Sequence, residues 1–145
     1  MAALAFTGCE KSKMSFIETV KSQNDQTTTL TKLVKLIKDE NLTYYETFDH
    51  LANAKKINKF FTPESVVMFG NPHFATTLMQ CNPSMGVDLP LRIVVTTNYE
   101  GETSLIYTNP EYWSLKHNIK DKKCLTILGK ARMALEDLTS KAAKK

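Results

Sequence analysis

The stretch Val66–Leu91, VVMFGNPHFATTLMQCNPSMGVDLPL, decides the fold. It opens with a continuous apolar run, Val66–Phe69, which predicts a strand buried on both faces. Gly70 ends the run, Asn71 is a good N-cap, and Pro72 fits the first helical position, where no N–H is required. We therefore predict a buried strand, a sharp turn and a short helix in succession.

The predicted helix has one apolar face. Three residues recur along it at i, i+4 and i+7: Phe74, Leu78 and Cys81. Asn82-Pro83 then ends the helix, and residues 91–97 (LRIVVTT) return as a strand. Because so many residues restrict the backbone around a buried strand, we expect a shaped wall or pocket beside residues 70–91.

The rest of the chain predicts an α+β fold. Further strands are expected over residues 14–20, 42–48 and 103–107, and helices through residues 30–37, over 50–57, after Asn109-Pro110 and from Lys122 onward. Strands and helices do not alternate, so the class is a mainly antiparallel sheet packed by helices. We expect a single domain over residues 14–141 and a frayed tail over residues 142–145.

Composition excludes several classes of protein. The chain of 145 residues has a net charge of +4, and its basic residues are nearly all lysines, with only Arg92 and Arg132 as arginines. A nucleic-acid reader usually has a denser basic stripe with arginines, so no nucleic-acid partner is predicted. No apolar run approaches the length of a membrane span.

The three cysteines form no CxxC pair. Neither a disulfide framework nor a zinc ribbon is therefore predicted, and Cys81 and Cys124 are expected to be buried, inert thiols. Cys9 follows MAALAFTG, which is similar to the end of a bacterial lipoprotein signal. Residues 1–13 are either the remnant of such a signal, lipidated at Cys9, or a disordered tail with an incidental cysteine.

From Phe48 to Ile119 the chain resembles the bacterial domain of unknown function 302. The resemblance is carried by Asp49-His50 with Ala52 and Ala54, by Phe69-Gly70-Asn71-Pro72, by Leu78-Met79, by Asp88-Leu89-Pro90-Leu91, and by Tyr107, Asn109-Pro110, Tyr112 and His117. It implies a fold similar to the TATA-binding protein, in the order β-α-β(4)-α, and frequent homodimers. It implies no established activity, and the fold likeness alone does not predict DNA binding.

The candidate ligand-binding residues come from these motifs: Asp49, His50, Asn71, Met79, Asp88, Tyr107 and His117. Each polar member stands near the end of a strand or helix, so several are expected to meet at one edge of the sheet. Their alternative role is structural, because Asp49 and Asn71 are good helix caps and His117 suits a helix C-terminus. No metal is predicted, since no pair of ligands shows a metal-binding spacing.

The sequence favours a non-enzymatic domain that binds or senses an unknown small ligand, with no cofactor. One alternative is a metal-dependent or acid–base enzyme that uses His50, Asp88 and His117. Another is a homodimeric interaction module. The expected location depends on whether Cys9 is lipidated. If it is, the protein belongs to the bacterial cell envelope or periplasm and contacts the membrane only through that anchor; otherwise it is expected in the cytoplasm.

Overall fold

The computed structural model describes residues 16–145, so the predictions for residues 1–13 and for Cys9 lie outside the described residues. Five antiparallel strands form one sheet in the order β1-β5-β4-β3-β2. Their bounds are β1 Ile17–Lys21, β2 Thr43–Asp49, β3 Glu64–Gly70, β4 Leu91–Thr97 and β5 Thr103–Thr108. The predicted α+β class with an antiparallel sheet is confirmed.

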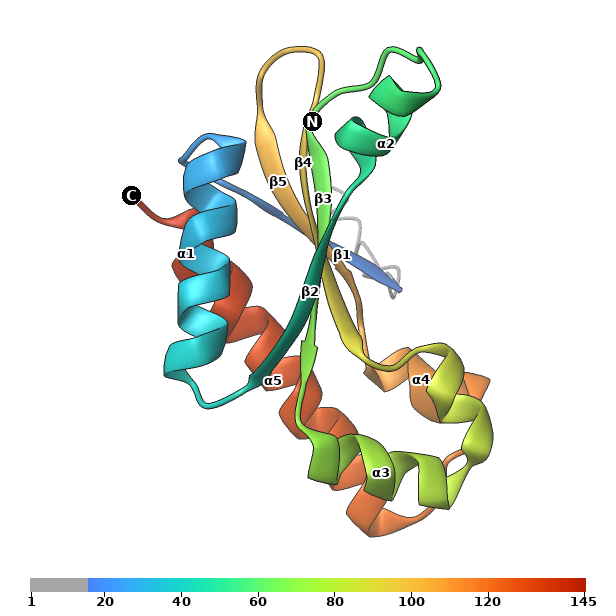
Figure 1. Cartoon of the computed structure of the whole chain (residues 1–145). Helices are drawn as coiled ribbons and strands as arrows, with labels where there is room; N and C mark the ends of the chain where they lie inside the picture. Colours follow the sequence, from blue (N-terminus) through green and yellow to red (C-terminus); the bar gives the residue numbers. More distant parts are fainter. Residues whose placement is uncertain (1–15) are drawn as a thin grey trace, which may run out of the picture.

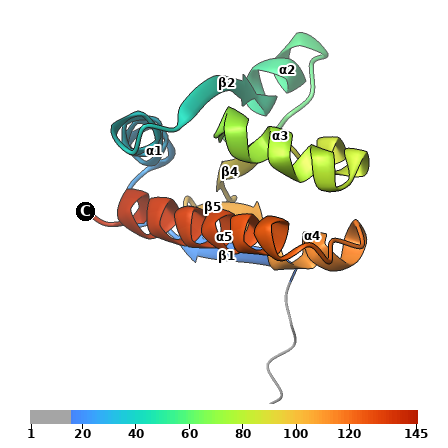
Figure 2. The same ribbon diagram turned by 90° about the horizontal axis from the view of Figure 1, so that it is seen from below.

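The helices lie on one face of the sheet and at its two ends (Figures 1 and 2). Their bounds are α1 Gln26–Asp39, α2 His50–Lys56, α3 Pro72–Cys81, α4 Glu111–Lys116 and α5 Lys122–Ala143, with a 3₁₀ turn, η1, at Pro83–Val87. Helices α1 and α5 pack side by side against one face of the sheet. Helices α3 and α4 gather at one end of the strands, and α2 lies at the other.

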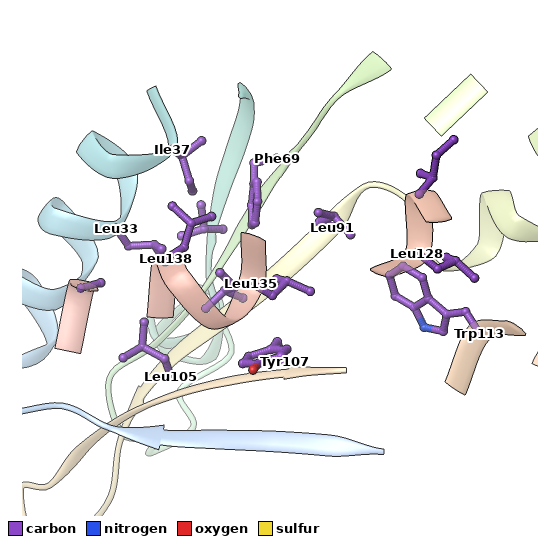
Figure 3. Packing of buried hydrophobic residues seen from close by; sticks show 14 of the residues in the cluster. Leu33, Ile37, Phe69, Leu91, Leu105, Tyr107, Trp113, Leu128, Leu135 and Leu138 are labelled. Carbon is purple, nitrogen blue, oxygen red and sulfur yellow. The ribbon is translucent and has the colours of Figure 1, made fainter. Parts of the chain in front are cut away.

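The core lies between the sheet and the helices α1 and α5 (Figure 3). Alternate strand residues supply one half of it: Val67, Phe69, Ile93, Val95, Leu105 and Tyr107. The helices supply the other half with Leu33, Ile37, Leu128, Leu135 and Leu138. Strand β3 was predicted to be buried on both faces, which is wrong, because Val66 and Met68 point to the opposite face and are only half-buried.

Local capping fixes the helix boundaries, at Asn71 as the sequence predicts. The Asp25 carboxylate accepts the backbone N–H of Thr28 at 2.7 Å, and Asn41 closes the α1 turn with φ 55°, in the left-handed region. Asn71 accepts the N–H groups of His73 and Phe74 at 3.0 and 3.2 Å. These bonds satisfy helix donors that otherwise have no partner within the helix.

The C-terminal end of α5 lies beside the loop that follows β1. Gln23 donates its backbone N–H to the Ala143 carbonyl at 2.8 Å, and the Gln23 side chain accepts the N–H of Lys145 at 3.1 Å. A frayed tail was predicted over residues 142–145, whereas Ala142 and Ala143 are helical and buried. Sequence pattern missed this contact because its two partners are far apart along the chain.

Candidate functional site

The predicted wall beside residues 70–91 lines a pocket, here called the apolar pocket, of about 550 Å³ including its open mouth. Its walls come from the end of β3, from α3, from the Leu89–Leu91 segment and from α5. Leu78 and Ile127 are buried wall residues, whereas Phe74 is partly exposed. Among the lining residues Lys130 is the charged one, and its ammonium group lies 5.5 Å from the centre of the Phe74 ring.

A second cavity, here called the β4–β5 cavity, lies where strands β4 and β5 separate, and holds about 740 Å³ of empty space including its open mouth. The two strands pair only between residues 94–97 and 103–106, so the first residues of β4 leave β5. Asp88, Arg92, Tyr107 and Trp113 line this cavity. Within the part of the chain that the structure describes, the buried indole Nε1 of Trp113 has no hydrogen-bond partner.

A polar cluster stands beside the β4–β5 cavity, where η1 meets the end of α4. His117 is 5% exposed, and its Nε2 lies 2.5 Å from an oxygen of Asp88. Its Nδ1 lies 2.6 Å from the Ser84 hydroxyl. Lys116 contacts the same Asp88 carboxylate at 2.9 Å, and Asn82 donates its side-chain amide to the His117 carbonyl at 2.8 Å. Both ring nitrogens of His117 are therefore engaged.

The cluster controls the charge of Asp88. Burial by itself would raise the pKa of this carboxyl, but hydrogen bonds from His117 and Lys116, with the positive charge of Lys116, outweigh burial and hold the pKa below its usual value. Asp88 is therefore ionised at neutral pH. When the Asp88 carboxylate accepts the Nε2–H of a neutral His117, the Nδ1 atom can accept a hydrogen bond from the Ser84 hydroxyl.

The comparisons agree with this fold. Residues 18–141 match the family described as domain of unknown function DUF302. The chain belongs to the DUF302 family. The crystal structure of an uncharacterized conserved DUF302 protein from Bacillus stearothermophilus has the same fold, with a TM-score of 0.77, 21% sequence identity, and coverage of 88% of this chain and 98% of that one. The predicted family resemblance is confirmed.

Curated relatives match this chain over part of their own length. The chain is 28% identical over 105 residues to proteins named fluoride-specific ion channel FluC 1 from Brucella suis and from Brucella abortus. The match covers 72% of this chain but 41% and 39% of those proteins, so the chain spans about two fifths of the curated relatives it matches. Over residues 16–145, no helix combines the length and the hydrophobicity needed to cross a membrane.

The DUF302 fold brings together only part of the predicted site. Asp88 and His117 are in direct contact, Asp88 and Tyr107 line the β4–β5 cavity, and Asn71 lines the apolar pocket. Met79 is partly exposed on α3 and lines neither of these two hollows. Burial, and next the carboxylates of Glu136 and Glu18, raise the pKa of Tyr107.

Several polar candidates were expected to meet at one edge of the sheet, but Asp49 and His50 do not join Asp88 and His117. Asp49 caps α2 by accepting the N–H of Ala52 at 2.9 Å, and the His50 ring packs against Phe48 with centroids 5.7 Å apart. Strand β2 is antiparallel to β3, so Asp49 pairs with Ser65 at the start of β3, whereas Leu91 of β4 pairs with Phe69 near its end. The two groups therefore lie at opposite ends of the strands.

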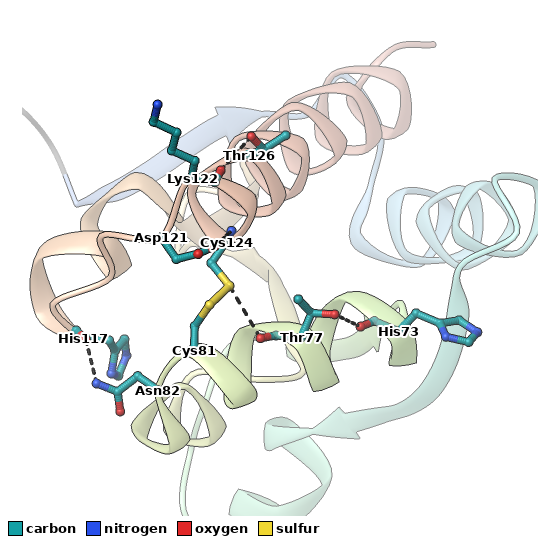
Figure 4. The surroundings of a disulfide bond; sticks show 9 residues. All are labelled: His73, Thr77, Cys81, Asn82, His117, Asp121, Lys122, Cys124 and Thr126. Atoms are coloured by element: carbon teal, nitrogen blue, oxygen red, sulfur yellow. Dashed lines mark hydrogen bonds between the residues drawn. A yellow bond between two sulfur atoms is a disulfide. The ribbon is translucent and has the colours of Figure 1, made fainter.

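The prediction of two inert buried thiols is also wrong. Cys81 and Cys124 form a disulfide that joins the last residue of α3 to the first turn of α5 (Figure 4). Cys124 is fully buried, but Cys81 is exposed. The 43-residue separation follows no spacing motif, so only the packing of α3 against α5 reveals the pair. Ser84 was likewise passed over, because no sequence motif surrounds it.

Proposed function

We propose that this DUF302 domain binds a small, mostly apolar ligand that has one anionic group, in the apolar pocket. The observation that carries the proposal is a pocket whose walls are almost wholly hydrophobic and whose one charged lining residue is a lysine. Ligand sites typically combine apolar walls with a few polar groups that fix the orientation of the ligand.

The apolar walls would provide the affinity. Leu78, Ile127 and Leu91 are buried residues of the core that also face this pocket. An apolar ligand placed against them removes hydrocarbon surface from water, which is favourable by about 25 cal/mol per Å². A flat or linear hydrocarbon body therefore fits the pocket better than a sugar or a polar metabolite does.

Lys130 would select the ligand's polar end. Lys130 is exposed, and its ammonium group lies over the Phe74 ring. Among the described residues this group has no ion-pair partner. A carboxylate or sulfonate at the mouth of the pocket would find this cation within the reach of a flexible side chain. Asn71 is occupied as the cap of α3 and holds the other side of the pocket in place.

Decanoate and decanol test the proposal as a matched pair, because they share a chain and differ in charge. Each is titrated against protein that has bound the apolar anionic dye anilinonaphthalene sulfonate, and loss of dye fluorescence reports displacement. We expect decanoate to displace the dye more strongly than decanol does. Lys130→Met should weaken decanoate by up to about fivefold, the value of an exposed charge pair, and leave decanol unchanged.

A pocket-filling variant provides the control. Ala134 lines the pocket from α5, so Ala134→Phe should fill it and abolish displacement by both compounds, with folding checked by circular dichroism. Undiminished binding by Ala134→Phe would place the dye elsewhere and refute the proposal. So would equal displacement by both compounds that Lys130→Met does not change.

The Ser84–His117–Asp88 contacts favour a second candidate function, acid–base chemistry at the serine. The histidine would accept the Ser84 proton at Nδ1 while the ionised Asp88 stabilises the resulting imidazolium, as in serine hydrolases. An active serine would react covalently with a fluorophosphonate probe, and His117→Gln would abolish labelling. Absence of labelling in the folded wild-type chain would leave the cluster as a structural tie between η1 and α4.

A further inference from the structure

We propose that Cys81, Cys124 and Asp121 bind a thiophilic divalent cation, such as Zn²⁺, once their disulfide is reduced. One ligand atom from each of the three residues lies within 4.8 Å of the others, and Figure 4 shows the three side chains converging between α3 and α5. The proposal is independent of the ligand proposed for the apolar pocket.

The fold holds the three donors in place. Asp121 is the N-cap of α5 and accepts the backbone N–H of Cys124 at 3.0 Å, so the carboxylate is fixed beside the sulfur. Cys124 is fully buried, and its sulfur lies 3.5 Å from the Thr77 carbonyl of α3. Cys81 ends α3 and faces the same point from the other side. The donors therefore come from two helices that already pack together.

The spacing suits a metal as well as a disulfide. The Cα atoms of Cys81 and Cys124 are 6.8 Å apart, at the wide end of the range that a disulfide spans. In a tetrahedral zinc site the metal–sulfur distance is about 2.3 Å, which separates neighbouring donors by roughly 3.5–4 Å. Moving the two sulfurs apart by side-chain rotation therefore reaches that geometry without moving the helices.

The donor chemistry selects soft cations. Thiolates prefer Zn²⁺ and similar ions over Mg²⁺ or Ca²⁺, which take oxygen ligands. Cys124 lies in the first turn of α5, where the positive end of the helix favours the thiolate. Cys81 and Asp121 are exposed, so water can complete the fourth position of the ion.

The change of state balances with a dithiol as reductant. The dithiol transfers two electrons and two protons to the Cys81–Cys124 bond and becomes a disulfide itself, leaving two thiols on this chain. Binding of one divalent cation then releases two protons, one from each thiol. Helices α3 and α5 are thus joined in both states, by a covalent bond when oxidised and through the cation when reduced.

The test uses the full chain with Cys9→Ser, so that Cys81 and Cys124 are the remaining thiols. The protein is reduced, freed of reductant without air, and titrated with Zn²⁺ against a chromophoric zinc chelator. We expect one Zn²⁺ per chain, and protection of both thiols from alkylation. The oxidised chain should bind no Zn²⁺ at this site.

Asp121→Asn is the matched variant, since asparagine is also a good N-cap but is a poorer ligand. We expect it to weaken Zn²⁺ binding at least tenfold with the fold intact, and Cys81→Ser to abolish protection of Cys124. Asp39→Asn, an exposed acidic residue of α1, should change nothing. The proposal fails if the reduced parent chain binds no Zn²⁺, or if Asp121→Asn binds it as tightly as the parent.

Discussion

The Cys81–Cys124 disulfide should contribute a large share of the stability of this domain. It closes a loop between residues 43 apart in sequence. In the chain-entropy description, a cross-link of that span removes enough freedom from the unfolded chain to stabilise the fold by about 4 kcal/mol at 25 °C. A domain of this size has a total stability of about 5–15 kcal/mol, so loss of the bond is a major perturbation.

The measurement compares urea unfolding of the Cys9→Ser chain in its oxidised and reduced forms. The reduced sample contains a metal chelator, so that no cation replaces the bond. With a slope of about 2 kcal/mol per molar urea, reduction should lower the midpoint by about 2 M. The variant with Cys81→Ala and Cys124→Ala should resemble the reduced chain under both conditions, apart from its own packing change at Cys124.

A difference below about 1 kcal/mol between the two forms would refute the reasoning. It would mean that the unfolded chain already keeps α3 and α5 close together, or that the bond strains the native packing.

Four further outcomes are expected. Leu135→Ala should cost about 2–5 kcal/mol in denaturant unfolding, because Leu135 is 1% exposed in the core, and a cost near zero would contradict the packing of α5 on the sheet. The interactions that lower the pKa of Asp88 stabilise the fold above the unfolded pKa of the carboxyl, about 3.9, and this stability is lost as pH falls through the lower folded value. Asp88→Asn should therefore lose less stability than the parent chain as pH falls below about 4. The sheet face opposite the helices carries apolar Val66, Val94 and Ile106, with acidic Glu46 and Glu64 and basic Arg92 around them. A second copy could pair these opposite charges, so light scattering should detect a dimer that Val94→Glu dissociates. If Cys9 is lipidated, the protein expressed from its native gene should fractionate with membranes, and Cys9→Ser should release it or leave an unprocessed precursor.

Local chemistry in the sequence predicted most of the fold. Asn71-Pro72, Asp25 and Asn41 specify where helices begin or end, because a cap acts within three residues of itself. The β-branched and aromatic residues of segments 91–97 and 103–107 predicted strands, and these two strands hydrogen-bond to each other. These signals are short-range, so they can be detected in a single chain.

The site depended on long-range geometry and was predicted less well. His50 and Asp88 both stand beside strand ends, but only the strand order shows that these ends are opposite ones. Ser84 meets His117 across 33 residues, and Cys81 meets Cys124 across 43. No periodicity links such partners, because their contact arises from how α3, α4 and α5 pack.

The pairing of β1 with β5 has a consequence for synthesis on the ribosome. Ile17 of β1 pairs with Thr108 of β5. Strand β1 therefore emerges about 90 residues before its partner strand. At about 5–20 residues per second, that delay is roughly 5–18 s. Helix α5, which covers β5 and reaches back to Gln23, emerges later still. Strand β1 must therefore wait for its partner β5 until almost the whole domain has been translated. During that delay it would be the natural segment for a chaperone to shield.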